Sequence, residues 1–157
     1  MQFMQIRPYQ AGDAPALFEI FQTAIHQTAA ADYTAEQRLA WAPPDRDPQA
    51  WAARMDAIMP WVLINCSQQP LAYASLNDSG YIDHFFVHGQ HARQGLGALL
   101  MQYLLAQAQA KSLLQLSADV SRTAQPFFAH YGFTVVQERF PVRDGIVIPN
   151  TLMHKLI

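Results

Sequence analysis

Hydrophobic residues recur every three or four positions through the first third of the chain, which is typical of amphipathic helices. Residues 3 to 9 instead alternate apolar and polar side chains and predict an opening strand. Asp13 can cap a first helix. Thr34 and Gln37 form a capping-box pattern for a second helix. PPDRDP, residues 43 to 48, ends that helix and begins a third. The apolar face of the first helix consists of Leu17, Ile20, Phe21, Ala24 and Ile25.

The middle of the chain changes to short apolar runs separated by turn residues. Strands are predicted at 61–66, 71–76 and 81–87, and the turns SQQP and NDSG between them indicate an antiparallel meander. A long helical pattern covers residues 95–110, and LLQLSA at 113–118 predicts the next strand. Strand, helix and strand in this order form a right-handed crossover unit, so the strands at both of its ends should be parallel.

The last third predicts one more helix and two strands. The helix covers residues 123–131 and ends at Gly132, which suits a left-handed cap. Strands are predicted at 133–139 and 147–155. No repeat or linker divides the chain, so residues 1–157 are predicted to form a single domain of the α/β class, with a mixed sheet of the α+β type.

Composition narrows the classes of function. Hydrophobic residues make up 51% of the chain and charged residues only 14%, against about 25% in typical proteins. A surface so poor in charge suits a homodimer contact, a lined cleft, or merely an Ala- and Gln-rich exterior. The net charge is −2 and no basic block is present, which argues against nucleic acid as a partner.

Membrane and redox context also follow from the sequence. No apolar run approaches the roughly 20 residues that span a bilayer, and the start MQFMQIRPYQ does not resemble a secretory signal. We therefore expect a cytoplasmic protein without a membrane partner. Cys66, the single cysteine, lies in the apolar run WVLINC and is interpreted as a strand residue and not as a nucleophile.

The glycines at the start of the long helix predict an anion site. Gly95 and Gly97 leave backbone N–H groups open at the positive end of the helix dipole, and Arg93 adds a cation. A P-loop would need a Lys-Ser/Thr pair, and the dinucleotide fingerprint would need a third glycine where Leu100 stands. Without further signals, the two glycines could equally form only a tight turn.

A second motif favours the anion site. RQGLGALL follows a strand ending in FFV, and TAQPFFAHYGF follows about 30 residues later. Together they resemble the GNAT superfamily of N-acetyltransferases, with its Q/R-x-x-G-x-G/A loop and its N-x-x-A-x-x-F-Y-x-x-x-G-F segment. IRPYQAGDAPALFEIF resembles the first strand and helix of that family, and ADYTAEQRLAWAP, IDHFFVH and PFFAHYGF are similar to its bacterial YafP-like group.

This resemblance implies a GNAT-like fold and acetyl-CoA as co-substrate. The fold would have six to seven strands, four to five helices, and a V-shaped gap between the central parallel strands. The pyrophosphate of acetyl-CoA would meet Arg93, Gln94, Gly95, Leu96, Gly97 and Ala98, and its pantetheine would pair along Phe85, Phe86 and Val87. Ser121 stands at the asparagine position of the family and Phe128 at its tyrosine position, so both are expected at the cofactor.

The resemblance also implies direct attack by an amine in a ternary complex. A base on the strand of a family member lies two or four residues before the position of Phe85, which selects Asp83 first and Tyr81 second. Strand alternation places Asp83 and Phe85 on one face and His84 on the other, so His84 is a weaker candidate in spite of its suitable pKa. Phe128 has no hydroxyl to protonate the departing thiolate, which leaves Ser121, Tyr131 or solvent.

The acceptor is the least defined part of the prediction. His26, Tyr33 and Trp41 lie in the helical third, which forms the acceptor wall in this family. The low charge there argues against an acidic pocket for a polyamine or an aminoglycoside. A small-molecule amine and a protein N-terminus or lysine both remain open.

Two further functions remain open beside the acetyltransferase. Phe128 keeps open a catalytically inert acyl-CoA-binding module that acts as a sensor or partner domain, and a different acyl donor is the third reading. A metal site is not expected, because His84 and His88 would lie about 13 Å apart on an extended strand.

Overall fold

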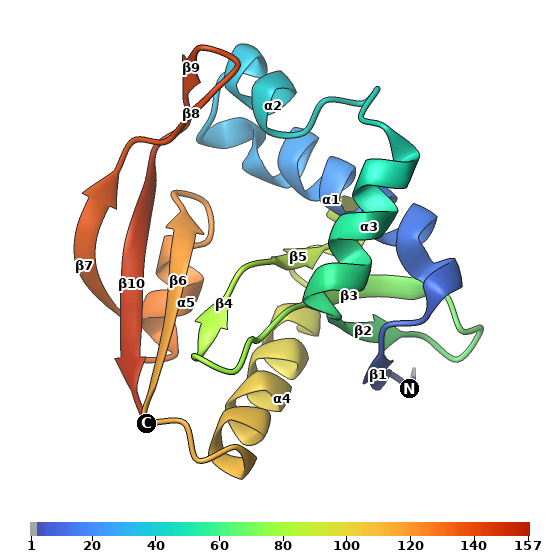
Figure 1. The fold of residues 1–157 in the computed structure, drawn as a ribbon, viewed down its shortest axis with the longest axis vertical. Helices are drawn as coiled ribbons and strands as arrows, with labels where there is room; N and C mark the ends of the chain where they lie inside the picture. Colours follow the sequence, from blue (N-terminus) through green and yellow to red (C-terminus); the bar gives the residue numbers. More distant parts are fainter. Residues whose placement is uncertain (1–2) are drawn as a thin grey trace.

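The computed structural model describes residues 3–157, which form two half-sheets that splay apart (Figure 1). The first has the strand order β1-β2-β3-β5 and the second the order β4-β6-β10-β7. The strands of the first are β1 (Gln5–Pro8), β2 (Trp61–Ile64), β3 (Pro70–Ala74) and β5 (Phe85–Val87). Those of the second are β4 (Tyr81–Ile82), β6 (Gln115–Ser121), β7 (Thr134–Arg139) and β10 (Asn150–Leu156), and β8 (Val142–Arg143) pairs with β9 (Ile146–Val147) as a separate hairpin.

The strand pairings confirm the predicted connections. β1, β2, β3 and β5 are antiparallel to their neighbours, as the meander requires. β4 and β6 are parallel, as the crossover predicts. β10 is antiparallel to both β6 and β7. The strand predicted at 147–155 is divided, because Ile148 and Pro149 separate β9 from β10.

The strand predicted at 81–87 is divided as well, and this division opens the gap between the half-sheets. Tyr81 and Ile82 pair with β6, whereas Phe85 to Val87 pair with β3. At the division, the backbone N–H groups of Asp83 and His84 donate to the side-chain oxygen of Ser75, at 3.2 and 3.0 Å. A single hydroxyl thus accepts from two successive amides, which a regular ladder would turn to opposite sides. The chain therefore changes sheets at Asp83 and His84.

The division also shifts the alternation of side chains, so the faces predicted for the strand at 81–87 are wrong. Ile82 packs in the same core cluster as Phe85, against α4 (Leu96–Ala110). Phe86 packs on the opposite side, in the cluster formed with α1 (Ala14–His26) and α3 (Pro48–Ile58). Strict alternation would have put Ile82 and Phe86 on the same face. The bend at Asp83 and His84 shifts the alternation by one residue, so the two side chains lie on opposite faces.

The helices begin and end largely where their caps predict. Thr34 and Gln37 form the capping box of α2 (Ala35–Trp41), with bonds of 2.9 and 3.1 Å. Gly132 follows α5 (Gln125–His130) with φ +89°. Asp13 differs from the prediction: it makes no cap bond to α1, and its carboxylate instead receives two hydrogen bonds from Arg7, at 2.7 and 2.9 Å.

Contacts from the helical third to the last third of the chain close the molecule over the gap. The hydroxyl of Tyr33 donates to the carbonyl oxygen of Pro149 at 2.6 Å and accepts from the N–H of Arg122 at 2.9 Å. Gln37 on α2 donates to the carbonyl oxygen of Val147 in β9 at 3.0 Å. Figure 1 shows α2 beside the β8–β9 hairpin at the top of the molecule.

Replacement of Ser75 by alanine tests whether its hydroxyl holds the divided strand. Ser75→Ala should lower the free energy of unfolding by about 1–3 kcal/mol, because two backbone N–H groups lose their acceptor beside a buried side chain. Urea unfolding followed by tryptophan fluorescence measures the loss. Ser67→Ala is the matched control, since Ser67 is exposed and, within residues 3–157, only its backbone N–H is hydrogen-bonded. Equal stability of the two variants would contradict the interpretation.

Candidate active site

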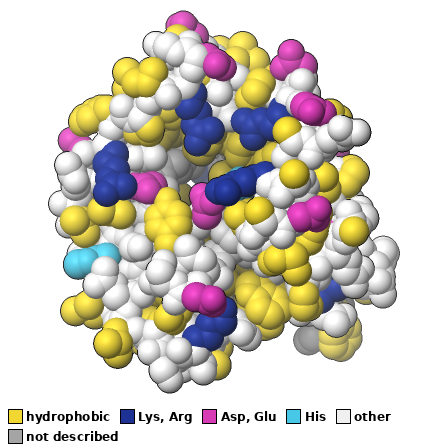
Figure 2. Space-filling model, in the orientation of Figure 1, with side chains coloured by type: hydrophobic (Ala, Val, Ile, Leu, Met, Phe, Trp, Pro, Cys, Tyr) yellow, Lys and Arg dark blue, Asp and Glu magenta, His cyan; other side chains and the backbone are white. Residues whose placement is uncertain are grey.

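A cavity of about 740 Å³ lies between the helical third and the second half-sheet, and we call it the arginine cavity. Figure 2 shows Lys or Arg side chains around a hollow in this face of the molecule, with acidic side chains next to them. The charged residues that line the cavity are Arg46, Arg54, Arg139, Arg143, Asp83 and Asp119. Its aromatic residues are Phe21, Tyr33, Trp41, Trp51, Tyr81, Phe86 and Phe140.

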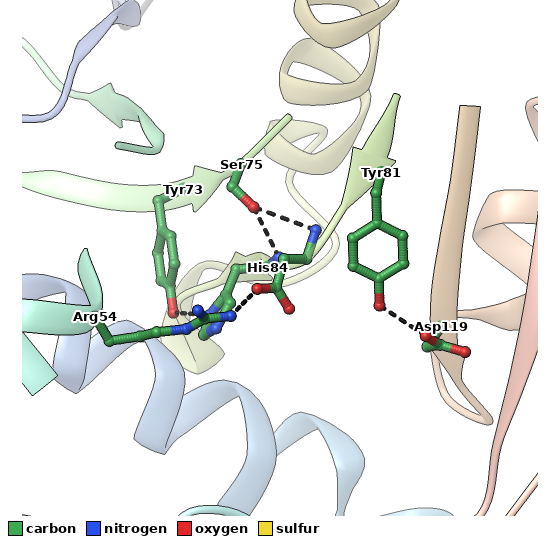
Figure 3. A network of polar contacts seen from close by, with 7 residues as sticks. Arg54, Tyr73, Ser75, Tyr81, His84 and Asp119 are labelled. Atoms are coloured by element: carbon green, nitrogen blue, oxygen red, sulfur yellow. Dashed lines mark hydrogen bonds and ion pairs between the residues drawn. The ribbon is translucent and has the colours of Figure 1, made fainter. Parts of the chain in front are cut away.

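The divided strand brings three predicted catalytic candidates to this cavity. Tyr81, Asp83 and His84 all line it. Figure 3 shows the Tyr81 hydroxyl directed toward Asp119, and His84 next to Tyr73. The expectation that His84 points away from Asp83 is therefore wrong, because the bend at Ser75 removes the alternation on which it rested. The direction of the side chain therefore does not distinguish Asp83 from His84 as the candidate base, and only their chemistry does.

Both acidic side chains of the cavity are paired with arginines. Asp83 forms an ion pair with Arg54, whose side chain is exposed. Asp119, on β6, accepts hydrogen bonds from the Tyr81 hydroxyl at 2.7 Å and from Arg139 at 3.0 Å. Burial, followed by the bond to Asp119, raises the pKa of Tyr81 well above its usual value. Tyr81 is therefore a hydrogen-bond donor to Asp119 at neutral pH and is not ionised.

His84 is half-buried among aromatic rings. The ring centroids of Phe86, Phe21 and Trp51 lie 5.5, 5.9 and 6.1 Å from that of His84. Its Nδ1 lies 3.1 Å from the hydroxyl of the fully buried Tyr73. Burial is the main reason that the pKa of His84 falls from 6.5 to about 4. The imidazole is therefore neutral at pH 7.

A second hollow, of about 470 Å³, runs from β5 to the start of α4, and we call it the apolar groove. The glycine loop forms one end of it. Arg93 and Gly95 both have positive φ, +62° and +82°, so the backbone turns sharply just before the first residue of α4. A Cβ at Gly97 would meet the Phe127 ring at 3.3 Å. The predicted residues that line the groove are Phe85, Phe86, Val87, Arg93, Gly95, Leu96, Gly97, Ala98 and Ser121.

The strand β5 presents a free backbone edge to the gap. It is the last strand of the first half-sheet, with β3 on its other side. The carbonyl oxygen of His84 accepts from the N–H of Ser75, just after β3, at 2.9 Å, and the N–H of His88 donates to the carbonyl oxygen of Leu71 in β3 at 2.8 Å. Because such bonds involve every second residue, the backbone groups of Phe85 and Val87 face away from β3.

The arginine cavity and the apolar groove meet at three residues. Trp41, Phe86 and Ser121 line both. Ser121 is the last residue of β6, and its side-chain oxygen accepts from the N–H of Ala124 at 3.1 Å, so its own hydrogen stays available. A molecule in the groove and a molecule in the cavity could therefore contact each other at this junction.

Four predicted site residues lie elsewhere. His26 lines neither hollow, and its Nε2 lies 2.7 Å from the carbonyl oxygen of Ala42. Phe128 is buried in the core with 3% exposure, and its neighbour Phe127 lines the groove. Tyr131 packs on Phe127 outside both hollows, with ring centroids 5.1 Å apart. Gln94 lies in the glycine loop but does not line the groove.

The charged wall of the arginine cavity was not predicted from the sequence. Arg46 and Arg54 come from the helical third, whereas Arg139 and Arg143 come from the last third. No local motif joins them. The only available signal was the proline-flanked PPDRDP segment, where Arg46 interrupts a loop between two helices.

Within residues 3–157, no three His, Cys, Asp or Glu side chains gather in a way that could hold a metal ion. None of the helices in this part of the chain is both long and apolar enough to cross a bilayer.

The chain is similar in sequence to known proteins. A family model described as an acetyltransferase (GNAT) domain matches residues 29–155. The chain is 38% identical over 146 residues to the uncharacterized N-acetyltransferase YafP of Escherichia coli K12, which covers 92% of this chain and 91% of the relative. The predicted family and its YafP-like group are thereby confirmed.

Solved structures are similar over nearly the whole chain. A crystal structure of a GCN5-related N-acetyltransferase from Rhodopseudomonas palustris matches with a TM-score of 0.92 and 32% identity, and covers 100% of this chain and 98% of the other. A putative acetyltransferase, YncA, from Salmonella typhimurium, solved with acetyl-CoA, matches with a TM-score of 0.68 and 22% identity, and covers 98% and 94%. The second likeness concerns the fold alone.

The depressed pKa of His84 predicts how stability depends on pH. An unfolded histidine binds its proton near pH 6.5, whereas the folded protein binds it only near pH 4. Between these values the unfolded state holds more protons, so stability is complete above about pH 6.5 and falls as the pH decreases toward 4. The loss due to His84 should be about 3 kcal/mol.

Chemical unfolding at several pH values measures this contribution as a difference between proteins. His84→Asn should flatten the decline between pH 6.5 and 4 relative to the unchanged protein. His130→Asn is the control, because His130 is exposed and lines neither hollow. A decline of the same steepness in all three proteins would refute the buried, neutral imidazole.

Proposed function

Because the chain belongs to the GNAT family of acetyltransferases, we propose that it transfers an acetyl group from acetyl-CoA to a primary amine by direct attack in a ternary complex. The observation that carries this proposal is the junction at Trp41, Phe86 and Ser121, where a groove with an anion-binding loop meets a polar cavity. The donor would lie in the groove and the acceptor in the cavity. The proposal retains the predicted cytoplasmic location.

The glycine loop would hold the pyrophosphate of acetyl-CoA. Its support is the start of a 15-residue helix at Leu96, whose first N–H groups carry the positive end of the dipole. Arg93 lines the same end of the groove. Two structural relatives support the same ligand, since the Salmonella protein was solved with acetyl-CoA and a PaiA N-acetyltransferase from Thermoplasma acidophilum with coenzyme A.

Pantetheine would extend β5 in the manner of an added strand. The outward backbone groups of Phe85 and Val87 supply hydrogen bonds for its two amides. The N–H of Phe85 would then lie next to the thioester carbonyl and stabilise the oxyanion that forms during attack. A fixed donor of this kind contributes about 3–4 kcal/mol in other acyl-transfer enzymes.

Asp83 is our choice for the base that removes the proton of the amine. It lines the cavity as a carboxylate held by Arg54. The competing base, His84, has its Nδ1 next to the Tyr73 hydroxyl, which has no other hydrogen-bond partner within residues 3–157. Because that hydroxyl would otherwise leave its hydrogen unsatisfied, it donates to Nδ1, and Nε2 then carries the imidazole proton. His84 would therefore be a donor and Asp83 the acceptor.

The attack forms a bond between the amine nitrogen and the acetyl carbon and breaks the bond between that carbon and sulfur. The amine proton passes to Asp83, directly or through water, and the thiolate takes a proton from its surroundings. Ser121 is our candidate donor, because it lines both hollows and its hydrogen is available. Tyr131 lies outside both hollows and is less suited to this role.

A second function remains supported by one observation. Phe128 is a buried core residue without a hydroxyl at the position where the family carries a tyrosine acid. A module that binds acetyl-CoA without turnover would need no acid there.

The release of free thiol from acetyl-CoA separates the two functions. We expect thiol to appear with at least one member of a panel of primary amines, and acetyl-CoA to bind with or without an amine. Acetyl-CoA binding by calorimetry without thiol release for any acceptor would instead favour the inert module.

Asp83→Asn tests the base with an acceptor that gives turnover. The variant should lower kcat about 10²-fold at pH 7, because general base catalysis typically contributes 10²–10⁴-fold. His84→Asn is the matched control from the same wall of the cavity and should lower kcat less than about tenfold. A larger loss in the His84 variant than in the Asp83 variant would reverse the assignment.

A further inference from the structure

The arginine cavity contains more positive than negative charge. Asp83 and Asp119 are paired with Arg54 and Arg139. Arg46 and Arg143 also line the cavity, and within residues 3–157 neither has a carboxylate within 4.0 Å. Two cations are thus left without an acidic partner in a partly enclosed site.

Arg46 is half-buried and held in place by neutral groups. Its guanidinium lies 5.4 Å from the ring centroid of Phe21 and 5.8 Å from that of Trp51. One of its nitrogens donates to the carbonyl oxygen of Trp41 at 3.0 Å. These contacts orient the guanidinium and leave other N–H groups for a ligand, since the side chain has five.

Arg143 comes to the cavity from the β8–β9 hairpin. It pairs with Ile146 across the hairpin, and the hydrogen bond from Gln37 to Val147 attaches β9 to α2. Burial first, and then the charge of Arg143, lowers the pKa of Arg46. The two guanidinium groups therefore repel each other, and an anion between them would relieve this repulsion.

These observations deepen the function proposed above and rest on it. We propose that the acceptor is a free α-amino acid with an apolar side chain, and that Arg46 and Arg143 bind its carboxylate. Two guanidinium groups suit a carboxylate because each can offer parallel N–H donors. Phe21, Trp41 and Trp51 form the apolar part of the wall and would accommodate the side chain.

The charges that the proposal needs all line one cavity. Asp83, Arg46 and Arg143 share its volume of about 740 Å³. In an α-amino acid, a single carbon separates the amino group from the carboxylate. The amine could therefore face Asp83 while the carboxylate faces Arg46 and Arg143.

A protein N-terminus fits this pair of cations less well than a free amino acid does. The first residue of a polypeptide has an uncharged amide where a free amino acid has its carboxylate. Placement of that amide between two cations would leave them without a counter-charge. An amino-acid amide imitates the polypeptide, so comparison of acid and amide distinguishes the two kinds of acceptor.

Binding of the acetylated product tests the proposal without the need for turnover. Isothermal titration of the CoA-saturated protein would compare N-acetyl-L-phenylalanine with N-acetyl-L-phenylalaninamide. We expect the acid to bind at least about tenfold more tightly, as for hydrogen bonds between charged groups. Equal binding of the two, preference for the amide, or binding of neither would overturn the proposal.

Three charge-removing variants locate the effect. Arg143→Gln and Arg46→Gln should each reduce the preference for the acid to less than about threefold. Lys111→Gln removes a cation at the far end of α4 and should preserve the preference. Arg143 is exposed, so its variant provides the test even where replacement of Arg46 impairs folding. Retention of the full preference in Arg143→Gln would overturn the assignment of that residue.

Thiol release with L-phenylalanine and L-phenylalaninamide separates this proposal from the function on which it rests. If the acid is the preferred acceptor and its KM rises about tenfold in Arg143→Gln, the acetyltransferase function and the amino-acid acceptor are both supported. Turnover of the amide alone leaves the acetyltransferase in place and refutes the amino-acid acceptor. No turnover in spite of tight, arginine-dependent binding of the acid supports the anion site and counts against the acetyltransferase.

Discussion

The hydroxyl of Ser75 stabilises the bend at which the two half-sheets separate. It accepts hydrogen bonds from the N–H groups of Asp83 and His84, so a strand that begins beside β6 ends beside β3. Because this bend satisfies both amides, the chain can leave one sheet and enter the other without an unpaired buried donor. The edge of β5 and the end of β6 then face each other without pairing, and a ligand can lie between them.

The same bend brings the functional groups of the site together. It turns Asp83 and His84 toward one cavity, and it leaves the backbone of Phe85 free on the side of the groove. The helical third closes the cavity through Tyr33, whose hydroxyl bridges Pro149 and Arg122. Arginines from the first and last thirds of the chain thereby line one cavity, in which a cation without an acidic partner is unfavourable until an anion binds.

Local patterns predicted those parts of the molecule that depend on neighbouring residues. The capping box at Thr34, the left-handed Gly132 and the glycine loop at Gly95 follow from backbone conformations that few residue types adopt easily. The antiparallel meander and the parallel crossover follow from connection lengths. The family resemblance supplied the gap and the expected place of acetyl-CoA.

Features that depend on distant contacts were not predictable in this way. Alternation failed between Asp83 and His84 because Ser75, which follows β3 and precedes His84 by nine residues, accepts both of their N–H groups. Phe127 and not Phe128 reached the groove, since one step along a short helix turns a side chain by about 100°. The four arginines of the cavity are spread over residues 46 to 143, and only the folded chain brings them together.

The central claim is that donor and acceptor meet where the groove joins the arginine cavity. A crystal structure of the protein with CoA bound tests it most directly. We expect the pyrophosphate at the amides of residues 93–98 and the sulfur at the junction of Trp41, Phe86 and Ser121, within reach of the Phe85 N–H. CoA bound in the arginine cavity, or with its sulfur away from this junction, would contradict the account.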